Sequence, residues 1–466
     1  MKVILIGLGL LVAPLAAQAP KTLSPNDQRA RDIFEQLINI NTTGSSGSTT
    51  VAAQAMAKRL TDAGFPPADV QVVGLAGSKN FNLVARHRGT GIQKPILFLA
   101  HLDVVEARRE DWSMDPFTFV EKDGFFYGRG TLDIKDGAAI LVAAFARLKQ
   151  EGYRPNRDLI LALTTGEEGG SDYNGVEWLL ANRRDLVDAA YAINMDSGDP
   201  AIINGKRTLR SVQASEKVYV TFKLEVHNPG GHSSLPTKDN AIYRLAAALD
   251  RLSVFQFPAQ LNEITRTYFE RMSALQPGAL SADMAAVARA TPDTAAVRRL
   301  SDASPFYNAQ LRTTCVATQL IGGHAENALP QMARAMVNCR MLPGTPAADV
   351  QRALQGVVND TAVAITVVSP AIPSPPSPLT PEVMGAIERV TKRLWNVPVV
   401  PVMETGATDG LYFRNAGIPV YGVSGVFVDI NDIRAHGRDE RIGVRDYYDG
   451  AEYIYQLTKE LSSTRR

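Results

Sequence analysis

The chain has few cysteines and no excess of charge of either sign. Its 466 residues include two cysteines, 49 lysines and arginines and 48 aspartates and glutamates, and the formal net charge is +1. Two cysteines are too few for a disulfide scaffold or a thiolate zinc site. The balanced charge, without a basic stripe, argues against a nucleic-acid partner. At this length we expect more than one domain.

Long apolar runs are also absent after the first residues. The opening "MKVILIGLGLLVAPLAAQAP" places an apolar stretch between Lys2 and the small-residue sequence Ala17-Gln18-Ala19. This is the layout of a secretory signal peptide, and it is short for a membrane span. We expect residues 1–19 to be a cleavable signal and the protein to be secreted or periplasmic, without stable membrane association afterwards.

Three continuous apolar runs have the pattern of buried parallel strands. They are "PILFLA" (95–100), "DLILALTT" (158–165) and "AYAINM" (190–195). Helical patterns lie between them at 137–150 and 175–187. Strands buried on both faces and alternating with helices predict an α/β domain with a largely parallel central sheet flanked by helices.

The pattern changes near residue 213. "VYVTFKLEV" (218–226) alternates strictly, as in an antiparallel strand with one solvated face. A helix over 239–252 with Asp239 as N-cap is expected next, and then a helical insertion over 255–312. "RTTCVATQLIGG" and "ARAMVNCRMLPG" predict two more strands, and the proline-rich 369–381 resembles a linker.

The simplest organisation is one α/β domain interrupted by a smaller α+β domain. The expected bounds are 20–212 for the first part of the α/β domain, 213–375 for the inserted domain and 376–466 for the second part.

Potential metal ligands follow each of the three buried strands. The strand ends supply His101, Asp103, Glu167, Glu168 and Asp196. Because ligands bind outside the carboxyl ends of strands in open α/β sheets, these side chains should converge in one crevice.

Two further residues complete the candidate set, Asp133 in "GRGTLDIKDG" and His436 in "DIRAHGRDE". Taken singly, each candidate ligand could have a structural role instead, such as a helix cap or a hydrogen-bonded histidine. Such a role would have to apply to all five candidates at once. The carboxylates of Asp133, Glu168 and Asp196 carry a charge of −3, and two divalent ions carry +4. A bridging hydroxide would balance the remaining charge, so this set suits a site for two ions. Imidazole with carboxylate favours Zn²⁺, and Mn²⁺ or Co²⁺ would also fit.

The motifs "HLDVV", "GRGTLDIKDG", "TTGEEGGS", "NMDSG", "GGHSSLP", "ENALP", "NCRMLPG" and "GATDG" occur in an order that resembles one family. This is the family of dinuclear zinc peptidases that includes aminoacylase, glutamate carboxypeptidase and carnosinase-like dipeptidases. The resemblance covers nearly the whole chain after the expected signal.

For the metal centre, the resemblance implies that Asp133 bridges two ions, with His101 and Asp196 on one and Glu168 and His436 on the other. It also implies that Glu167 is the general base, which moves a proton from the metal-bound water to the leaving amine. Asp103, two residues after His101, is placed to orient that imidazole.

For the inserted domain, the resemblance implies a lid that pairs two subunits into a homodimer. His232 would stabilise the oxyanion, commonly from the partner subunit. Asn327 and Arg340 match positions that hold the substrate's amide and carboxylate. Gly406 and Thr408 lie in a loop that lines the pocket, and this chain departs from its relatives at Ala407, where glycine is frequent.

We therefore expect an exported dinuclear metallohydrolase that cleaves a peptide or N-acyl amino-acid amide bond next to a free carboxylate. An N-acyl-amino-acid amidase is the alternative within this class. A periplasmic solute-binding protein is the alternative outside it, and an intact metal set with Glu167 argues against that. Cys315 and Cys339 lie 12 residues on either side of Asn327. They are expected to form either a bridge across paired strands or two buried thiols.

Overall fold

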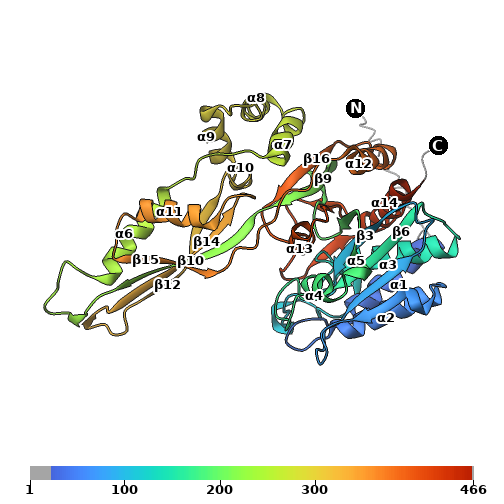
Figure 1. The fold of residues 1–466 in the computed structure, drawn as a ribbon, viewed down its shortest axis with the longest axis horizontal. Coiled ribbons are helices and arrows are strands. Elements are labelled where there is room, and N and C mark those ends of the chain that lie inside the picture. The colour runs from blue at the N-terminus through green and yellow to red at the C-terminus, as the bar shows by residue number, and fades with distance from the viewer. Residues whose placement is uncertain (1–22, 464–466) are drawn as a thin grey trace, which may run out of the picture.

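The computed structural model describes residues 23–463 as a large α/β body and an elongated inserted domain (Figure 1). The expected signal over 1–19 lies outside the described residues. No helix in the described part of the chain is long and apolar enough to cross a membrane. The predicted fold class, an α/β domain with helix-flanked sheet and an α+β insertion, is confirmed.

The large body is built on a 10-stranded sheet. The strand order is β1 (Val70–Val73), β2 (Asn82–His87), β6 (Arg157–Thr164), β3 (Gln93–His101), β7 (Tyr191–Asn194), β17 (Val420–Gly422), β9 (Lys206–Glu216), β8 (Pro200–Ile203) and β18 (Val428–Asp429), with β16 (Val399–Glu404) also paired to β9.

This sheet is mixed, whereas the sequence predicted a largely parallel one. The centre is parallel, because β6, β3, β7 and β17 pair in parallel. The pairs β1–β2, β2–β6, β8–β9 and β17–β9 are antiparallel. The β8–β9 pair is a tight hairpin whose turn residues Asn204 and Gly205 both have positive φ, which reverses the chain within two residues.

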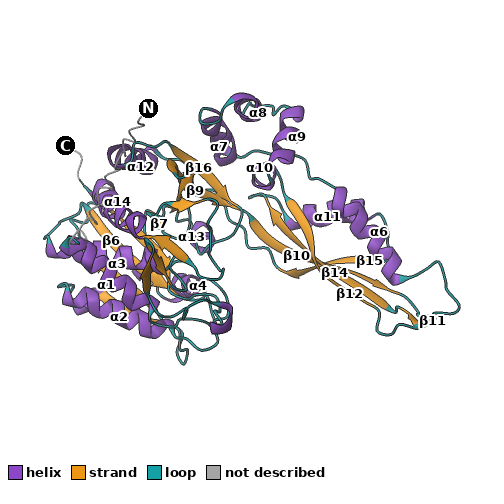
Figure 2. Cartoon of the chain, turned by 180° about the vertical axis from the view of Figure 1, so that it is seen from behind, coloured by secondary structure: helices purple, strands orange, loops and turns teal. Residues whose placement is uncertain are grey.

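Helices cover both faces of the sheet (Figure 2). Alternate residues of β3 show this, since Ile96 and Phe98 pack into one core while Leu97 and Leu99 pack into another. The first core receives α1 (Pro25–Ile38), α2 (Thr49–Asp62), α3 (Lys135–Gln150), α12 (Pro381–Leu394) and α14 (Val444–Ser462). The second receives α4 (Gly175–Asn182), α5 (Arg184–Val187) and α13 (Gly410–Asn415).

The inserted domain is a four-stranded antiparallel sheet with helices on one face. Its order is β12 (Thr314–Gly322), β14 (Met332–Met341), β10 (Val218–His227) and β15 (Val363–Ser369). β10 is antiparallel with one buried face, as the sequence predicted. Its alternating residues face α6 (Ala241–Val254) and α11 (Ala347–Val358). The N-cap of α6 is Asn240, so the prediction of Asp239 was wrong. Asn240 accepts two backbone N–H bonds, whereas Asp239 binds Arg244.

The two cysteines form a disulfide across this sheet. Cys315 on β12 lies directly opposite Cys339 on β14, with 4.1 Å between their Cα atoms. Of the two alternatives left by the sequence, the structure supports the bridge.

The helical insertion packs against the large body. It consists of α7 (Glu263–Ser273), α8 (Gly278–Val287), α9 (Thr294–Ala303) and α10 (Pro305–Leu311). Phe269 of α7 shares a core with Val400 and Val402 of β16. The proline-rich segment 369–381 also packs against the large body. The backbone N–H of Ser377 donates to the carbonyl of Ala214, and its hydroxyl donates to the carbonyl of Val420.

Small elements complete the fold. They are the sheet of β4 (Val120–Lys122), β5 (Phe125–Tyr127) and β19 (Arg441–Gly443), the pair β11 (Gly231–His232) and β13 (Ala328–Leu329), and the short helices Pro67–Asp69 and Arg109–Asp111.

Candidate metal centre

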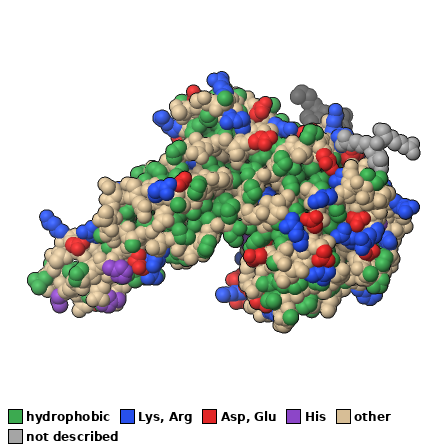
Figure 3. Space-filling view, in the orientation of Figure 1, with side chains coloured by type: hydrophobic (Ala, Val, Ile, Leu, Met, Phe, Trp, Pro, Cys, Tyr) green, Lys and Arg blue, Asp and Glu red, His purple; other side chains and the backbone are tan. Residues whose placement is uncertain are grey.

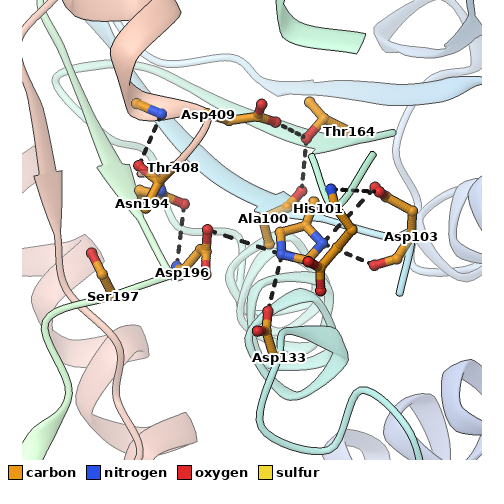
Figure 4. A network of polar contacts seen from close by, with 12 residues as sticks. Ala100, His101, Asp103, Asp133, Thr164, Asn194, Asp196, Ser197, Thr408 and Asp409 are labelled. Carbon is orange, nitrogen blue, oxygen red and sulfur yellow. Dashed lines mark hydrogen bonds and ion pairs between the residues drawn. The ribbon is translucent and has the colours of Figure 1, made fainter. Parts of the chain in front are cut away.

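The metal-ligand candidates meet at the carboxyl edge of the central strands. Strand β3 ends at His101, with β6 on one side and β7 on the other. Glu167 and Glu168 lie in the turn that follows β6, and Asp196 follows β7. Three strand ends therefore deliver their side chains to one place, and Figure 4 shows His101, Asp133 and Asp196 facing each other.

Asp133 lies between the two imidazoles. Its Oδ1 is 3.2 Å from Nε2 of His101 and its Oδ2 is 3.0 Å from Nε2 of His436. Nε2 of His101 is also 3.9 Å from Oδ2 of Asp196, and Nε2 of His436 is 2.8 Å from Oε1 of Glu168. Each oxygen of Asp133 thus belongs to a separate group made of one histidine and one further carboxylate.

These groups have the composition and spacing of a site for cations. Ligand atoms of His101, Asp133 and Glu168 lie within 4.8 Å of one another, and so do those of His101, Glu167 and Asp196. Nε2 of His101 is buried and has no hydrogen-bond partner. A buried imidazole nitrogen that faces several carboxylate oxygens fits a divalent ion bound at that point. The residues present therefore fit two metal ions.

The protein groups alone leave strong electrostatic strain. Burial raises the pKa of Glu167 and of Asp196 well above the ordinary value, and repulsion from neighbouring carboxylates adds to the effect. Hydrogen bonds to Asp133 and Glu168 raise the pKa of His436 to about 10. Burial works to lower the pKa of His101, but the surrounding carboxylates hold it well above its usual range. Positive charge placed among carboxylates packed this closely would stabilise their charged forms.

Asp103 contacts the centre in two ways. Its backbone carbonyl accepts the Nδ1–H bond of His101 at 2.9 Å. Its carboxylate lies 3.9 Å from that nitrogen and instead accepts the N–H groups of Gly166 (2.8 Å) and Glu168 (3.0 Å). Asp103 therefore orients the imidazole through its backbone and fixes the turn that carries Glu167 through its side chain.

Gly166 is required in that turn. Its φ is +80°, and a Cβ at this position would lie 2.2 Å from the carbonyl oxygen of Tyr173. Only glycine allows the chain to turn this sharply after β6 and present Glu167 and Glu168 together.

Sequence reasoning missed the ion pair that supports Asp133 and His436. Glu440 accepts bonds from Arg129 (2.5 Å) and from the N–H groups of Leu132 (2.7 Å) and Asp133 (3.1 Å). Arg129 in turn donates to the carbonyl oxygens of His436 and Gly437. The sequence held one signal for this pair: Arg129 and Glu440 each lie close to a metal-ligand candidate in a loop that contains glycine.

A second missed residue is Asp409. Its buried carboxylate accepts bonds from Thr164 (3.1 Å) and Asn174 (2.7 Å), and Figure 4 shows it beside Thr164, the last residue of β6. Burial raises the pKa of Asp409 to about 6, and its charge adds to the repulsion felt by Glu167.

Comparison with known proteins identifies the family of the chain. Residues 97–460 match peptidase family M20/M25/M40. The chain belongs to this family. It is 31% identical over 377 residues to the human N-fatty-acyl-amino acid synthase/hydrolase, covering 78% of this chain and 73% of that protein.

Solved structures show the same fold. An M20 family metallo-carboxypeptidase from Sulfolobus solfataricus superposes with a TM-score of 0.69 at 16% identity, covering 93% of this chain and 99% of that one. A dinuclear metal binding peptidase from the M20 family of Bacillus subtilis gives 0.56 at 12% identity, covering 93% and 97%. The chain is thus an M20 family hydrolase.

The predicted lid residues His232 and Asn327 lie away from the metal centre of their own chain. His232 lies exposed on β11 at the tip of the inserted domain, and Asn327 lies beside it, its carbonyl accepting the N–H of Ser233. Figure 2 shows β11 at the end of the inserted domain farthest from the large body, and Figure 3 shows histidine side chains on the surface of that end. Arg340 lies nearer the large body on β14, with its guanidinium 4.9 Å from the ring of Tyr219.

The pocket-loop candidates lie after β16. Gly406 is partly exposed. Thr408 is buried, and its N–H (3.1 Å) and hydroxyl (3.0 Å) both donate to Glu216 at the end of β9. The hydroxyl of Thr408 therefore holds the loop in place in this arrangement.

Proposed function

We propose that this M20 hydrolase cleaves an amide bond next to a free carboxylate, in an N-acyl amino acid or a short peptide. One observation carries the proposal, namely the convergence of His101, Asp133, Glu168, Asp196 and His436 beside Glu167. The five ligands would hold two divalent ions, Zn²⁺ being the best match to this mixture of imidazole and carboxylate. Such ions supply polarisation of the scissile carbonyl and a nucleophile at neutral pH.

Glu167 is the general base. It is adjacent to the ligand Glu168 and contributes to the acidic group formed with His101 and Asp196. Burial raises its pKa, which favours a carboxylate that accepts a proton from the attacking water and returns it to the leaving nitrogen. Asp103 keeps the carboxylate in range by holding the turn on both sides of it.

Arg340 is the carboxylate clamp. It forms no ion pair with any described carboxylate, and its partner in the structure is the face of Tyr219. A guanidinium without an anionic partner can bind a substrate carboxylate in two parallel hydrogen bonds.

His232 acts on the site of a partner subunit. The N–H of Ser234 donates to Nδ1 of His232 (3.2 Å), so the neutral imidazole carries its proton on Nε2. That N–H can stabilise an oxyanion, but it lies at the tip of the inserted domain. It would therefore act at the metal centre of a second copy of the chain.

The inserted domain offers a surface for such a pair. Strand β12 forms one edge of its sheet, and it exposes Val316, Leu320 (68%) and Ile321. Tyr243 of α6, 67% exposed, adds to this apolar surface. An exposed, apolar edge strand is a typical pairing site, so we place the homodimer contact on β12 and α6.

An N-acyl amino acid is the second form of the same substrate class, and the human relative's activity on N-fatty-acyl amino acids favours it. Export rests on the opening signal pattern and on the Cys315–Cys339 disulfide, which suits an oxidising compartment.

A matched panel tests the function. Zn²⁺-loaded protein would be assayed with dipeptides, N-acetyl amino acids and N-dodecanoyl amino acids, each beside its C-terminal amide. We expect hydrolysis only of compounds with the free carboxylate. Equal rates on the amides would contradict the Arg340 clamp, and no hydrolysis of any member would contradict the proposed substrate class.

A further inference from the structure

A cavity of about 460 Å³ lies in the inserted domain, between the end of α6, α10 and the start of β12. Its size is within the ordinary range for small-molecule sites, roughly 300–1,000 Å³. Apolar side chains form most of its wall: Leu249, Leu252, Phe255, Phe257, Val337 and Leu354.

Arg312 lines this cavity and has no anionic partner among the described residues. It is 6% exposed, and its bonds go to Gln256 (2.7 Å), the carbonyl of Phe257 (3.1 Å) and the hydroxyl of Ser301 (3.1 Å). All three acceptors are neutral. Its Nε is buried without a partner, and none of the ion pairs among residues 23–463 includes it. A buried guanidinium is costly unless a negative charge compensates it.

Asn308 also lines the cavity and supplies a second unpaired group. Its side-chain oxygen is buried without a hydrogen-bond partner. Since the oxygen and nitrogen of an amide exchange places by a simple flip, Asn308 can offer an N–H to an acceptor in the cavity.

The cavity is separate from the substrate site. Cys339 and Val337 of β14 face α6 and α11, so the cavity is on the helix-covered side of the sheet. Arg340 alternates with them and pairs with Tyr219 on the opposite side. A ligand in the cavity therefore does not contact the carboxylate clamp.

We propose that this cavity binds an aliphatic carboxylate, with the carboxylate on Arg312 and Asn308 and the hydrocarbon chain along the apolar wall. A free fatty acid and an N-acyl amino acid share this chemistry. The proposal does not depend on which amide the metal centre hydrolyses.

Arg312 and the neighbouring Gln310 also contact the junction between the two bodies. The carbonyl of Arg312 accepts a bond from Lys217, at the point where β9 of the large body continues into β10. Gln310 of α10 donates to the carbonyl of Met403 on β16 (2.7 Å). Binding is therefore expected to stabilise the contact between α10 and the large body.

The test uses full-length, metal-loaded protein and dodecanoate that carries a terminal diazirine. After irradiation and digestion, we expect label on peptides covering 249–257 and 312–317. Competition with unlabelled dodecanoate or N-dodecanoylglycine identifies which source of the carboxylate binds, while dodecanol and butyrate should compete poorly. Label confined to peptides of the metal centre would overturn the proposal.

Two variants separate binding from folding. Arg312→Gln removes the charge and should weaken dodecanoate binding by at least about 10-fold, since hydrogen bonds to charged groups are the strong ones. Arg298→Gln, an exposed arginine on α9, is the matched control and should bind like wild type. Ser253→Trp fills the cavity from an exposed position and should abolish labelling even if Arg312→Gln does not fold. Unchanged labelling in Ser253→Trp would refute the site.

Discussion

Arg129 and Glu440 form a buried ion pair that joins two loops of the metal centre. The two side chains are 3% and 0% exposed, and they lie 311 residues apart in the sequence. Glu440 bonds the backbone around Asp133, while Arg129 bonds the carbonyl of His436. Because φ of His436 is +60°, in the left-handed region, this support also holds a strained backbone.

Removing one partner of this pair should weaken both folding and metal binding. Glu440→Gln leaves Arg129 buried without a charge partner, so the free energy of unfolding should fall by about 3–5 kcal/mol. Zn²⁺ affinity should also fall, because the loops of Asp133 and His436 lose their common support. Denaturant unfolding and metal titration measure the two effects.

An exposed ion pair provides the control. Glu452 pairs with Arg147 at 2.7 Å and its side chain is 43% exposed. Glu452→Gln should cost about 0–1 kcal/mol and leave metal affinity unchanged. If Glu440→Gln behaves like Glu452→Gln, the buried pair does not support the centre.

The disulfide should stabilise the inserted domain. Cys315 and Cys339 close a loop with a sequence separation of 24, for which chain entropy gives about 3 kcal/mol. The double change Cys315→Ala and Cys339→Ala should lower the denaturation midpoint of oxidised protein by a corresponding amount. It should have no such effect on reduced protein. Two titratable thiols in unreduced, denatured wild type would contradict the bridge.

Lys217 predicts a rise in stability with pH. Burial, and then the charge of Arg340, lowers the pKa of Lys217 to about 7 in the folded protein. Between pH 7 and 10 the unfolded chain binds one more proton at this lysine, so the free energy of unfolding gains up to about 1.4 kcal/mol per pH unit from it. Below pH 7 both states are protonated and the slope vanishes.

The comparison with Lys217→Met isolates that slope from other titrations. Denaturant unfolding at pH 6, 7.5 and 9 should show a difference between wild type and variant that moves in favour of wild type above pH 7. A difference that stays constant from pH 6 to 9 would show that Lys217 keeps its charge in the fold.

His232 should complement in trans. Each single variant, Glu167→Gln or His232→Ala, should be nearly inactive as a homodimer. In a mixed dimer of the two, one site receives both changes and the other receives neither, so purified mixed dimers should regain roughly half of wild-type activity by two-fold symmetry. Coexpression with two tags provides the mixed species.

The matched control carries the same two changes on one chain. When the double variant Glu167→Gln, His232→Ala pairs with wild type, each site receives one change if His232 acts in trans, and activity should stay low. If His232 acts within its own chain, this control regains half of the activity and the first mixed dimer stays inactive.

Much of the metal centre could be predicted from the sequence because the information is local. A buried strand has a visible end, and His101, Glu167, Glu168 and Asp196 each come at or just after one. The alternation of β10 was equally visible.

The remaining features depend on contacts between residues far apart in the sequence, or on which of two neighbouring residues forms a turn or a helix cap. The Arg129–Glu440 pair joins loops that only the fold brings together. The antiparallel edge of the sheet follows partly from the Asn204–Gly205 turn, a recognisable signal within an otherwise parallel pattern. At α6 two adjacent residues were both suitable caps, and the side chain of Asn240, rather than Asp239, accepts the N–H bonds.

The most direct test compares Glu167→Gln with Glu168→Gln for metal content and turnover. Glu167→Gln should retain two ions per subunit by elemental analysis and lose at least about 100-fold in kcat, since it removes the general base and leaves the ligands intact. Glu168→Gln should bind fewer ions, because it loses a ligand. Full turnover in Glu167→Gln with both ions bound would contradict the account.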